Sequence, residues 1–333
     1  MNYELSSKVL EEVKKAERIL INCHRNPDPD SIGSALALFG VLEEMGKKVE
    51  VICPTKLDKN TGFLKSFKKI KTIDFKKFNF KEFDLFMILD SSTWDMVTGA
   101  RDISRPEGLR IITIDHHFTN DNFGDINLID PKLTSAAELL YKVINDWRVE
   151  INSVTATALL AGIISDTGAF RYPGVSKETL QIASDLISKG ADKEKIIFNI
   201  FNNLELNVLK MVGEMISKLE LDEKHKFCWC AIPLPIYENY GKPDGAKEYA
   251  SNTFIQSITG TDFGIIMVEV EEKKLSVSFR SRGSFDVSKI ALALGGGGHK
   301  AAAGANILGV AFDDAVIKVL ETARKTANET QTR

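Results

Sequence analysis

Short apolar runs alternate with helical patterns of apolar residues through the first half of the chain. The runs at 18–22, 49–53, 84–89 and 110–114 are mostly rich in isoleucine, valine and leucine, as buried parallel strands are. Helical patterns cover 31–45, 135–146, 153–165 and 177–189. Alternation of this kind predicts an α/β fold with a doubly wound parallel sheet.

The pattern changes after residue 190. Strand patterns at 226–232, 264–270, 274–279 and 303–308, with helical patterns at 246–259 and 313–326, predict a smaller α+β domain. A length of 333 residues also favours two domains over one. We therefore expect a first domain over 1–190, a helical linker over 191–222 and a second domain over 223–330.

The charge balance limits the classes of partner. A protein that wraps long duplex DNA usually needs a basic excess, whereas this chain has a formal net charge of -3. A small anionic substrate in a local positive pocket is therefore favoured over long duplex DNA. No apolar stretch approaches the ~18 residues of a membrane span, and the polar N-terminus has no signal-peptide core, so we expect a cytoplasmic protein without membrane contact.

The most informative motif comes directly after the first strand pattern. His24, Asp28 and Asp30 lie within seven residues, and a helical pattern follows at once. A single His and Asp pair on a loop is usually structural. Here two carboxylates separated by one residue would raise each other's pKa and cost stability, unless a cation is bound beside them. We interpret the segment as a divalent metal site.

Further acids and imidazoles follow other apolar runs. Asp90 comes after 84–89, the sequence Asp115-His116-His117 after 110–114, and Asp166 after the apolar helix pattern at 153–165. A lone Asp after a strand is often only a helix N-cap. However, ligands bind beyond the carboxyl ends of parallel strands, so these side chains are expected to converge with the first motif. A shared carboxylate such as Asp90 could hold two ions about 3.5–4 Å apart, the spacing of two-metal hydrolases.

The second domain offers groups for an anion. A run of four glycines that includes Gly297 and Gly298 precedes His299, and its backbone N–H groups could surround a phosphate. Arg280 and Arg282 end a strand pattern, and arginine makes fork-like phosphate contacts. A flexible turn and a surface charge pair are the structural alternatives for these two segments. Together they predict a clamp for a nucleotide or phosphate.

In this order, the motifs resemble those of the DHH/DHHA1 phosphoesterase family. The resemblance covers nearly the whole chain. The tract from Asp166 to Pro173 and the chain length suit the branch of bifunctional oligoribonucleases and 3′-phosphoadenosine-5′-phosphate (pAp) phosphatases. Pro29 departs from the family pattern, in which a small residue is common at this position, but it leaves the ligands intact.

The resemblance implies two manganese ions. One would be held by His24, Asp28 and Asp90, and the other by Asp30, Asp90, His116 and Asp166. His117 would contact the scissile phosphate and Asp115 would orient a histidine, which makes Asp90, Asp115 and His117 the catalytic residues. Arg280, Gly297, Gly298 and His299 would hold the terminal nucleotide or phosphate. A mixed imidazole and carboxylate set also suits Mn²⁺ better than Mg²⁺, with Mg²⁺ and Co²⁺ as alternatives.

The expected enzyme hydrolyses short oligoribonucleotides to nucleoside 5′-monophosphates, pAp to AMP and phosphate, or both, by in-line attack of a metal-activated water. An alternative within the family is a phosphodiesterase for cyclic-di-AMP or the linear dinucleotide pApA, because the same metals serve it. A nucleotide sensor with a decayed site would lack ligands, and all of them are present. The expected partners are short RNA or a small nucleotide and, because dimers are common among soluble enzymes, a second copy of the chain.

Overall fold

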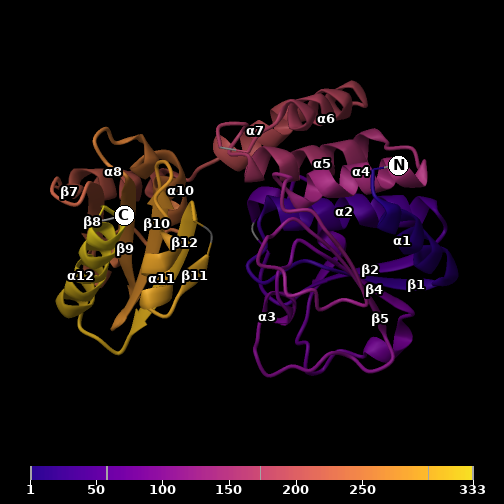
Figure 1. Cartoon of the computed structure of the whole chain (residues 1–333), viewed down its shortest axis with the longest axis horizontal. Coiled ribbons are helices and arrows are strands. Elements are labelled where there is room, and N and C mark those ends of the chain that lie inside the picture. Colours follow the sequence, from indigo (N-terminus) through magenta and orange to yellow (C-terminus); the bar gives the residue numbers. More distant parts are fainter. Residues whose placement is uncertain (1, 58, 173, 299, 332–333) are drawn as a thin grey trace. The chain divides into compact units, whose positions relative to one another are not determined.

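The computed structural model describes residues 2–57, 59–172, 174–298 and 300–331. The chain divides into two compact units, Met1–Asn203 and Leu204–Arg333 (Figure 1). The division falls between α7 (Lys193–Phe201) and α8 (Leu206–Ser217), inside the segment expected as a linker. The domain boundaries given above stay a prediction.

The first unit is built on a six-stranded sheet in which every neighbouring pair is parallel. Its strands are β1 (Arg18–Asn22), β2 (Lys48–Cys53), β3 (Ile70–Thr72), β4 (Leu85–Leu89), β5 (Arg110–Asp115) and β6 (Ile126–Ile129). Their spatial order is β3-β2-β1-β4-β5-β6, which confirms the doubly wound sheet. The order reverses between β1 and β4, and ligands bind at such a reversal, beyond the carboxyl ends of the strands.

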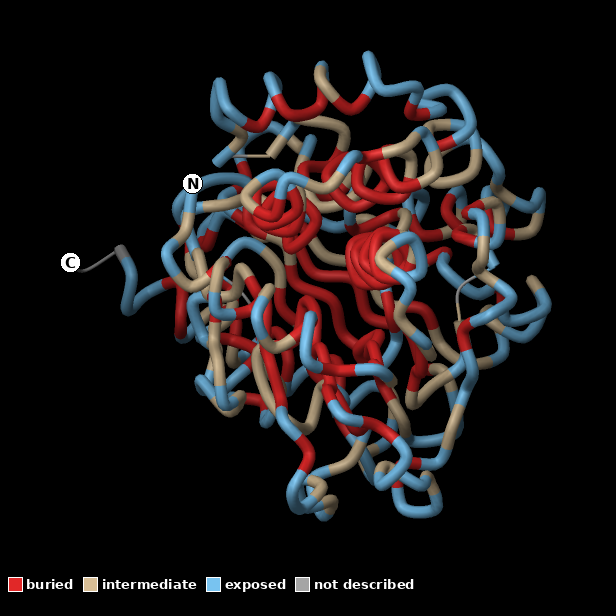
Figure 2. The backbone as a smooth tube through the Cα atoms, turned by 90° about the vertical axis from the view of Figure 1, so that its right-hand side faces the viewer, coloured by how far each residue is buried: buried red, intermediate tan, exposed pale blue. Residues whose placement is uncertain are grey.

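Helices cover both faces of this sheet. One face packs against α1 (Glu4–Lys15), α2 (Pro29–Glu44) and α4 (Ala136–Trp147). The helix α5 (Ser153–Asp166) packs on α2 and α4, and α6 (Lys177–Ser188) and α7 complete the same core. The other face packs against α3 (Trp94–Thr98) and loops that supply several aromatic side chains. Figure 2 shows the buried backbone concentrated in the central strands and in the helices packed on them.

Two glycines allow α2 and α5 to approach closely. A Cβ atom at Gly33 of α2 would fall on the carbonyl oxygen of Ala158 in α5. A Cβ atom at Gly162 of α5 would fall on the carboxylate of Asp30 in α2 and lie 2.7 Å from the Cβ of Ala137. Real Cβ atoms do not make such contacts, so both positions require glycine. The two helices therefore approach closely at these positions.

The second unit contains a mostly antiparallel sheet in the order β11-β12-β10-β9-β8-β7. In the part of the chain that the structure describes, β8 and β9 pair in parallel and the other neighbouring strands pair antiparallel. Its strands are β7 (Glu220–Asp222), β8 (Phe227–Ile232), β9 (Phe263–Glu271), β10 (Lys274–Ser281), β11 (Gly297–Gly298) and β12 (Ala302–Leu308). One face packs on α11 (Ser288–Ala293) and α12 (Phe312–Gln331), the other on α8, α9 (Leu234–Asn239) and α10 (Ala246–Thr253). The predicted α+β class is confirmed.

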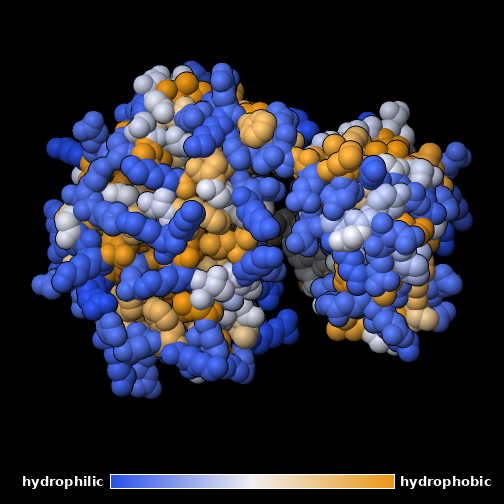
Figure 3. All heavy atoms as spheres, turned by 180° about the vertical axis from the view of Figure 1, so that it is seen from behind, coloured by the Kyte–Doolittle hydropathy of each residue, from blue (hydrophilic) through white to orange (hydrophobic). Residues whose placement is uncertain are grey.

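Among the described residues, no helix combines the length and apolar character needed to cross a bilayer. The face of the molecule in Figure 3 is covered largely by hydrophilic residues, with smaller apolar areas between them.

Candidate metal centre

The ends of three neighbouring strands supply the centre of the site. Asp90 directly follows β4, Asp115 ends β5, and His24 lies two residues beyond β1. Because β1 and β4 are adjacent, His24 Nε2 lies 3.3 Å from Asp90 Oδ2. Asp90 has a φ of 52°, a left-handed conformation that costs a non-glycine residue on the order of 1–3 kcal/mol and is typical of functional sites.

The start of α2 adds two carboxylates. Asp28 is the N-cap of this helix and accepts a hydrogen bond from the backbone N–H of Asp30, and Pro29 fits the first helical position because its missing N–H is not needed there. The Asp30 carboxylate is completely buried and lies against the N-terminus of α4. Its Oδ2 and Oδ1 accept hydrogen bonds from the N–H groups of Ala136 at 2.7 Å and Ala137 at 2.9 Å. A helix N-terminus favours this negative charge.

The imidazoles of His24, which is buried, and His116, which is partly buried, are held in the same way. His24 Nδ1 lies 2.9 Å from the carbonyl oxygen of Arg25, and His116 Nδ1 lies 3.4 Å from that of Leu133. A carbonyl only accepts, so each Nδ1 donates, and in a neutral ring Nε2 then carries the lone pair. His116 Nε2 lies 3.5 Å from Asp90 Oδ1, as His24 Nε2 faces Asp90 Oδ2. Both ligand-type nitrogens therefore point at carboxylate oxygens.

This arrangement fits a cation. Asp90 Oδ1 and His116 Nε2 are buried and have no hydrogen-bond partner among the described residues. A nitrogen lone pair facing a carboxylate oxygen is repulsive unless a proton or a cation lies between them. Three groups among the described residues could hold an ion, each with donor atoms within 4.8 Å of one another. Two of them contain all the expected ligands: His24, Asp28 and Asp90, and Asp30, His116 and Asp166. The structure thus brings together all six residues expected as metal ligands, and their roles as ligands stay a prediction.

The electrostatics of the cluster show competition between carboxylates. Burial and repulsion by Asp90 raise the pKa of Asp30 to about 7. Burial and the charges of Asp30 and Asp28 also raise the pKa of Asp166 well above its usual range. Burial opposes ionisation of Asp90, but the neighbouring imidazoles of His116 and His24, in their protonated forms, outweigh it and hold its pKa well below the usual range. A bound divalent cation would favour the charged form of every carboxylate.

His117 belongs to a separate chain of hydrogen bonds. Its Nδ1 lies 2.7 Å from Oδ1 of the buried Asp115, whose Oδ2 accepts a hydrogen bond from Asn120 Nδ2 at 2.6 Å. Burial opposes protonation of His117, but the bond to Asp115 outweighs it and raises its pKa. His117 also forms a candidate group with Asp90 and His116, although Asp115 already engages its Nδ1. Asn120 was not predicted, because a polar turn residue after the motif carries no signal of its own.

The expected substrate residues lie in the second unit. Arg280 is near the end of β10, where its guanidinium Nε donates to Asn252 Oδ1 at 2.8 Å, and Arg282 is exposed just beyond the strand. Gly297 and Gly298 form β11, which pairs with β12 next to β10. Arg280 and this glycine pair therefore lie on strands flanking β12. His299 lies outside the described residues.

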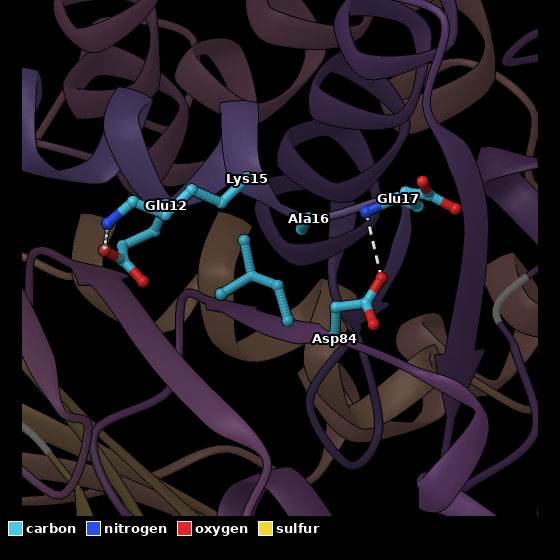
Figure 4. Close-up of a pocket in the computed structure, with 6 residues that line it drawn as sticks. Glu12, Lys15, Ala16, Glu17 and Asp84 are labelled. Atoms are coloured by element: carbon cyan, nitrogen blue, oxygen red, sulfur yellow. Dashed lines mark hydrogen bonds and ion pairs between the residues drawn. The ribbon is translucent and has the colours of Figure 1, made fainter.

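A pocket of about 350 Å³ lies at a different place (Figure 4). It is lined by Glu12, Lys15, Ala16, Glu17, Asp84 and Leu85, at the starts of β1 and β4. The backbone N–H groups of Glu17 and Arg18 donate to Asp84 Oδ2, so this carboxylate already has partners. The candidate metal centre lies at the opposite ends of the same strands.

Comparisons with known proteins agree with the fold and the motifs. Residues 18–163 match the family model of the DHH family, N-terminal domain, and residues 232–329 match the DHHA1 domain. A bifunctional oligoribonuclease and PAP phosphatase NrnA from Thermus thermophilus is 29% identical over 96% of this chain and 93% of its own length. The cyclic-di-AMP phosphodiesterase GdpP from Bacillus subtilis is 27% identical over 94% of this chain and 48% of its own length.

A solved structure matches almost the complete chain. The structure of an exopolyphosphatase-related protein from Bacteroides fragilis has a TM-score of 0.89 and 25% sequence identity, and the match covers 98% of this chain and 97% of that one. Both family models match in the order that the motifs predict. The chain therefore carries a DHH domain followed by a DHHA1 domain and belongs to the DHH family of phosphoesterases.

Proposed function

We propose that this enzyme is a manganese-dependent phosphoesterase that hydrolyses short oligoribonucleotides to nucleoside 5′-monophosphates and pAp to AMP and phosphate. The observation that carries the metal dependence is the pair of orphaned buried atoms, Asp90 Oδ1 and His116 Nε2, which face each other at 3.5 Å. The substrate class is supported by the similarity to NrnA, which covers nearly all of both chains.

The residues divide between two ions. His24, Asp28 and Asp90 would hold one, and Asp30, Asp90, His116 and Asp166 the other. Divalent cations at these positions would supply Lewis-acid polarisation of the phosphate and would ease the deprotonation of a water molecule. Imidazole together with carboxylate favours Mn²⁺ over Mg²⁺, with Co²⁺ as a further alternative.

His117 would act on the phosphate without holding an ion. Asn120 holds Asp115, and Asp115 in turn holds Nδ1 of His117, so the orientation of the ring is fixed before substrate binds. The raised pKa of His117 favours the imidazolium. A preorganised cation of this kind stabilises the negative charge that develops on the phosphate oxygens in the transition state.

A phosphodiesterase for cyclic-di-AMP or pApA is the second candidate. It is favoured by the similarity to GdpP, which covers 94% of this chain. However, this chain spans about half the length of GdpP and nearly all of NrnA. We therefore place short RNA and pAp first. The expected homodimer belongs to the same proposal.

A product assay tests the proposal. The full chain is incubated with pAp, pApA, cyclic-di-AMP and oligoribonucleotides of two to ten units, with Mn²⁺ or with a chelator, and products are separated by chromatography. We expect metal-dependent release of AMP and nucleoside 5′-monophosphates from pAp and the shortest oligomers. Turnover that persists in chelator would contradict the metal dependence, and faster turnover of cyclic-di-AMP than of pAp or dinucleotides would favour the second candidate.

A further inference from the structure

The segment just before and within the first turn of α4 contains a buried carboxylate that no step of the proposed reaction uses. Glu138 has no exposed surface. Its Oε2 accepts hydrogen bonds from both the backbone N–H of Thr134, at 3.0 Å, and the Thr134 hydroxyl, at 2.6 Å. Its Oε1 accepts a third from the hydroxyl of Thr179 in α6, at 3.0 Å. Glu138 therefore ties the loop before α4 to a neighbouring helix.

The same short segment supplies the groups that hold two of the expected metal ligands. The carbonyl of Leu133 accepts from His116 Nδ1, and the N–H groups of Ala136 and Ala137 donate to Asp30. These three backbone groups flank Thr134, the residue that Glu138 fixes. His116 follows β5, whereas Asp30 lies in α2. Because the segment from Leu133 to Ala137 contacts both side chains, it sets their relative position.

We propose that Glu138 is a positioning residue for the candidate metal centre. It fixes the segment from Leu133 to Ala137, and through that segment it sets the orientation of the His116 ring and the Asp30 carboxylate. It does not contact the ion or the substrate. The inference rests on the proposed function, because it takes His116 and Asp30 as ligands of one ion.

Physical considerations support a role beyond simple packing. A buried carboxylate loses its hydration, and only hydrogen bonds to its charged form offset that cost. An apolar side chain would fill the same space without this requirement. The carboxylate adds hydrogen bonds that hold Thr134 and the start of α6 at a fixed distance from α4. Partners that orient metal ligands typically change metal affinity or activity by about 10–100-fold when they are lost.

Two variants and a matched control test the role. Glu138→Gln keeps the size of the side chain, but its N–H₂ group must face the donors of either Thr134 or Thr179 and cannot accept their hydrogen bonds. Thr134→Val removes the Thr134 hydroxyl alone and leaves its backbone N–H bond. The control is Glu178→Gln in α6, whose exposed carboxylate pairs with Lys142 Nζ at 2.8 Å and lies outside the segment. The full-length proteins are titrated with MnCl₂ in a calorimeter, and the melting temperature of each metal-free protein is measured in parallel.

We expect the Kd for Mn²⁺ to rise about 10–100-fold in Glu138→Gln, to rise by a smaller factor in Thr134→Val, and to stay at the wild-type value in Glu178→Gln. Excess Mn²⁺ should restore part of the lost turnover. Wild-type Kd values in both test variants, with only a lower metal-free melting temperature, would show a merely structural role and overturn the inference. If Glu138→Gln does not fold, the Kd of Thr134→Val decides. Absence of Mn²⁺ binding to the wild-type protein would instead contradict the proposed function.

Discussion

Asp90 presents its two carboxylate oxygens to two different imidazoles, Oδ2 to His24 and Oδ1 to His116. We expect Asp90→Asn to lower Mn²⁺-dependent turnover by more than about a hundredfold, above the range for residues that only orient a ligand. The fold should persist, because the amide has the same shape and removes one charge from a crowded cluster. Turnover of a chromogenic phosphodiester and far-UV circular dichroism check both outcomes. Asp95→Asn in α3 is the control, and normal activity in Asp90→Asn would refute the shared role.

Asn120 affects the site through Asp115 and His117. In Asn120→Ala the buried Asp115 loses a hydrogen bond to a charged group, worth about 1.5–3 kcal/mol, so the His117 ring is held less firmly. We expect kcat to fall by about tenfold, with no change in the Kd for Mn²⁺. Steady-state kinetics and calorimetry separate the two quantities. The control Asn145→Ala, which loses an exposed hydrogen bond to the backbone carbonyl of Tyr141, should match wild type. Weaker Mn²⁺ binding in Asn120→Ala would contradict the assignment.

The predicted residues and the missed residues differ in how they reach the site. His24, Asp90 and Asp115 could be grouped from the sequence, because each follows an apolar strand and parallel strands end at one edge of the sheet. Asn120 and Glu138 act through hydrogen bonds to partners that the strand pattern does not bring together, such as Thr179, 41 residues beyond Glu138. The periodicity of a sequence carries no information about such pairs.

Two glycines in different helices provide a matched test at the level of elements. In Gly162→Ala the new Cβ would collide with the Asp30 carboxylate and Ala137, so α5 must move away from α2 and α4. We expect a loss of about 1–3 kcal/mol in the free energy of unfolding, together with weaker Mn²⁺ binding. In Gly213→Ala of α8 the new Cβ meets no atom within 4 Å, and the higher helix propensity of alanine should stabilise the protein by about 0.5–1 kcal/mol.

Chemical denaturation of both glycine variants measures these changes. If Gly162→Ala were as stable as Gly213→Ala and bound Mn²⁺ like wild type, the close contact between α5 and Asp30 would not be needed.

Several short elements were not predicted, because too few residues form them. The edge strands β3 and β6 have three and four residues, and α9 and α11 have six each. Such lengths cover less than two helical turns or only one or two pleats, so no period can be recognised in them. The strands that position the site, β1, β4 and β5, have five or six apolar-rich residues, and the helices α2 and α5 have 16 and 14, so their patterns were clear.

For the whole molecule, the sequence predicted the class of both domains but not the order of the strands in their sheets. Alternation of strands and helices implies a parallel sheet, and right-handed crossovers limit its topologies, yet no residue pattern states which strands pair. The reversal between β1 and β4 is therefore known only from the structure, and it explains why His24 and Asp90 meet.

The stability of the metal-free protein and the stabilising effect of Mn²⁺ should change with pH in opposite directions. In the metal-free chain the pKa of Asp30 is raised to about 7 and that of Asp166 is also raised, so the folded state binds more protons than the unfolded state between about pH 4 and pH 7. Burial opposes protonation of His24 and His116, but their carboxylate neighbours outweigh it and raise both pKa values, which extends the effect above the unfolded value of about 6.5. Asp90, with its lowered pKa, stays charged throughout.

Stability of the metal-free protein must then fall as the pH rises from 6 to 8. Mn²⁺ binds the deprotonated ligands, so its stabilising effect grows over the same range, and at a free concentration of 100 times Kd it amounts to about 2.7 kcal/mol. We expect the melting temperature in chelator to decrease from pH 6 to pH 8, and the increase on adding Mn²⁺ to be larger at pH 8. Thermal melts at three pH values, with chelator or with Mn²⁺, measure both trends. A metal-free melting temperature that rises with pH would show that these carboxylates and imidazoles are not crowded into one cluster.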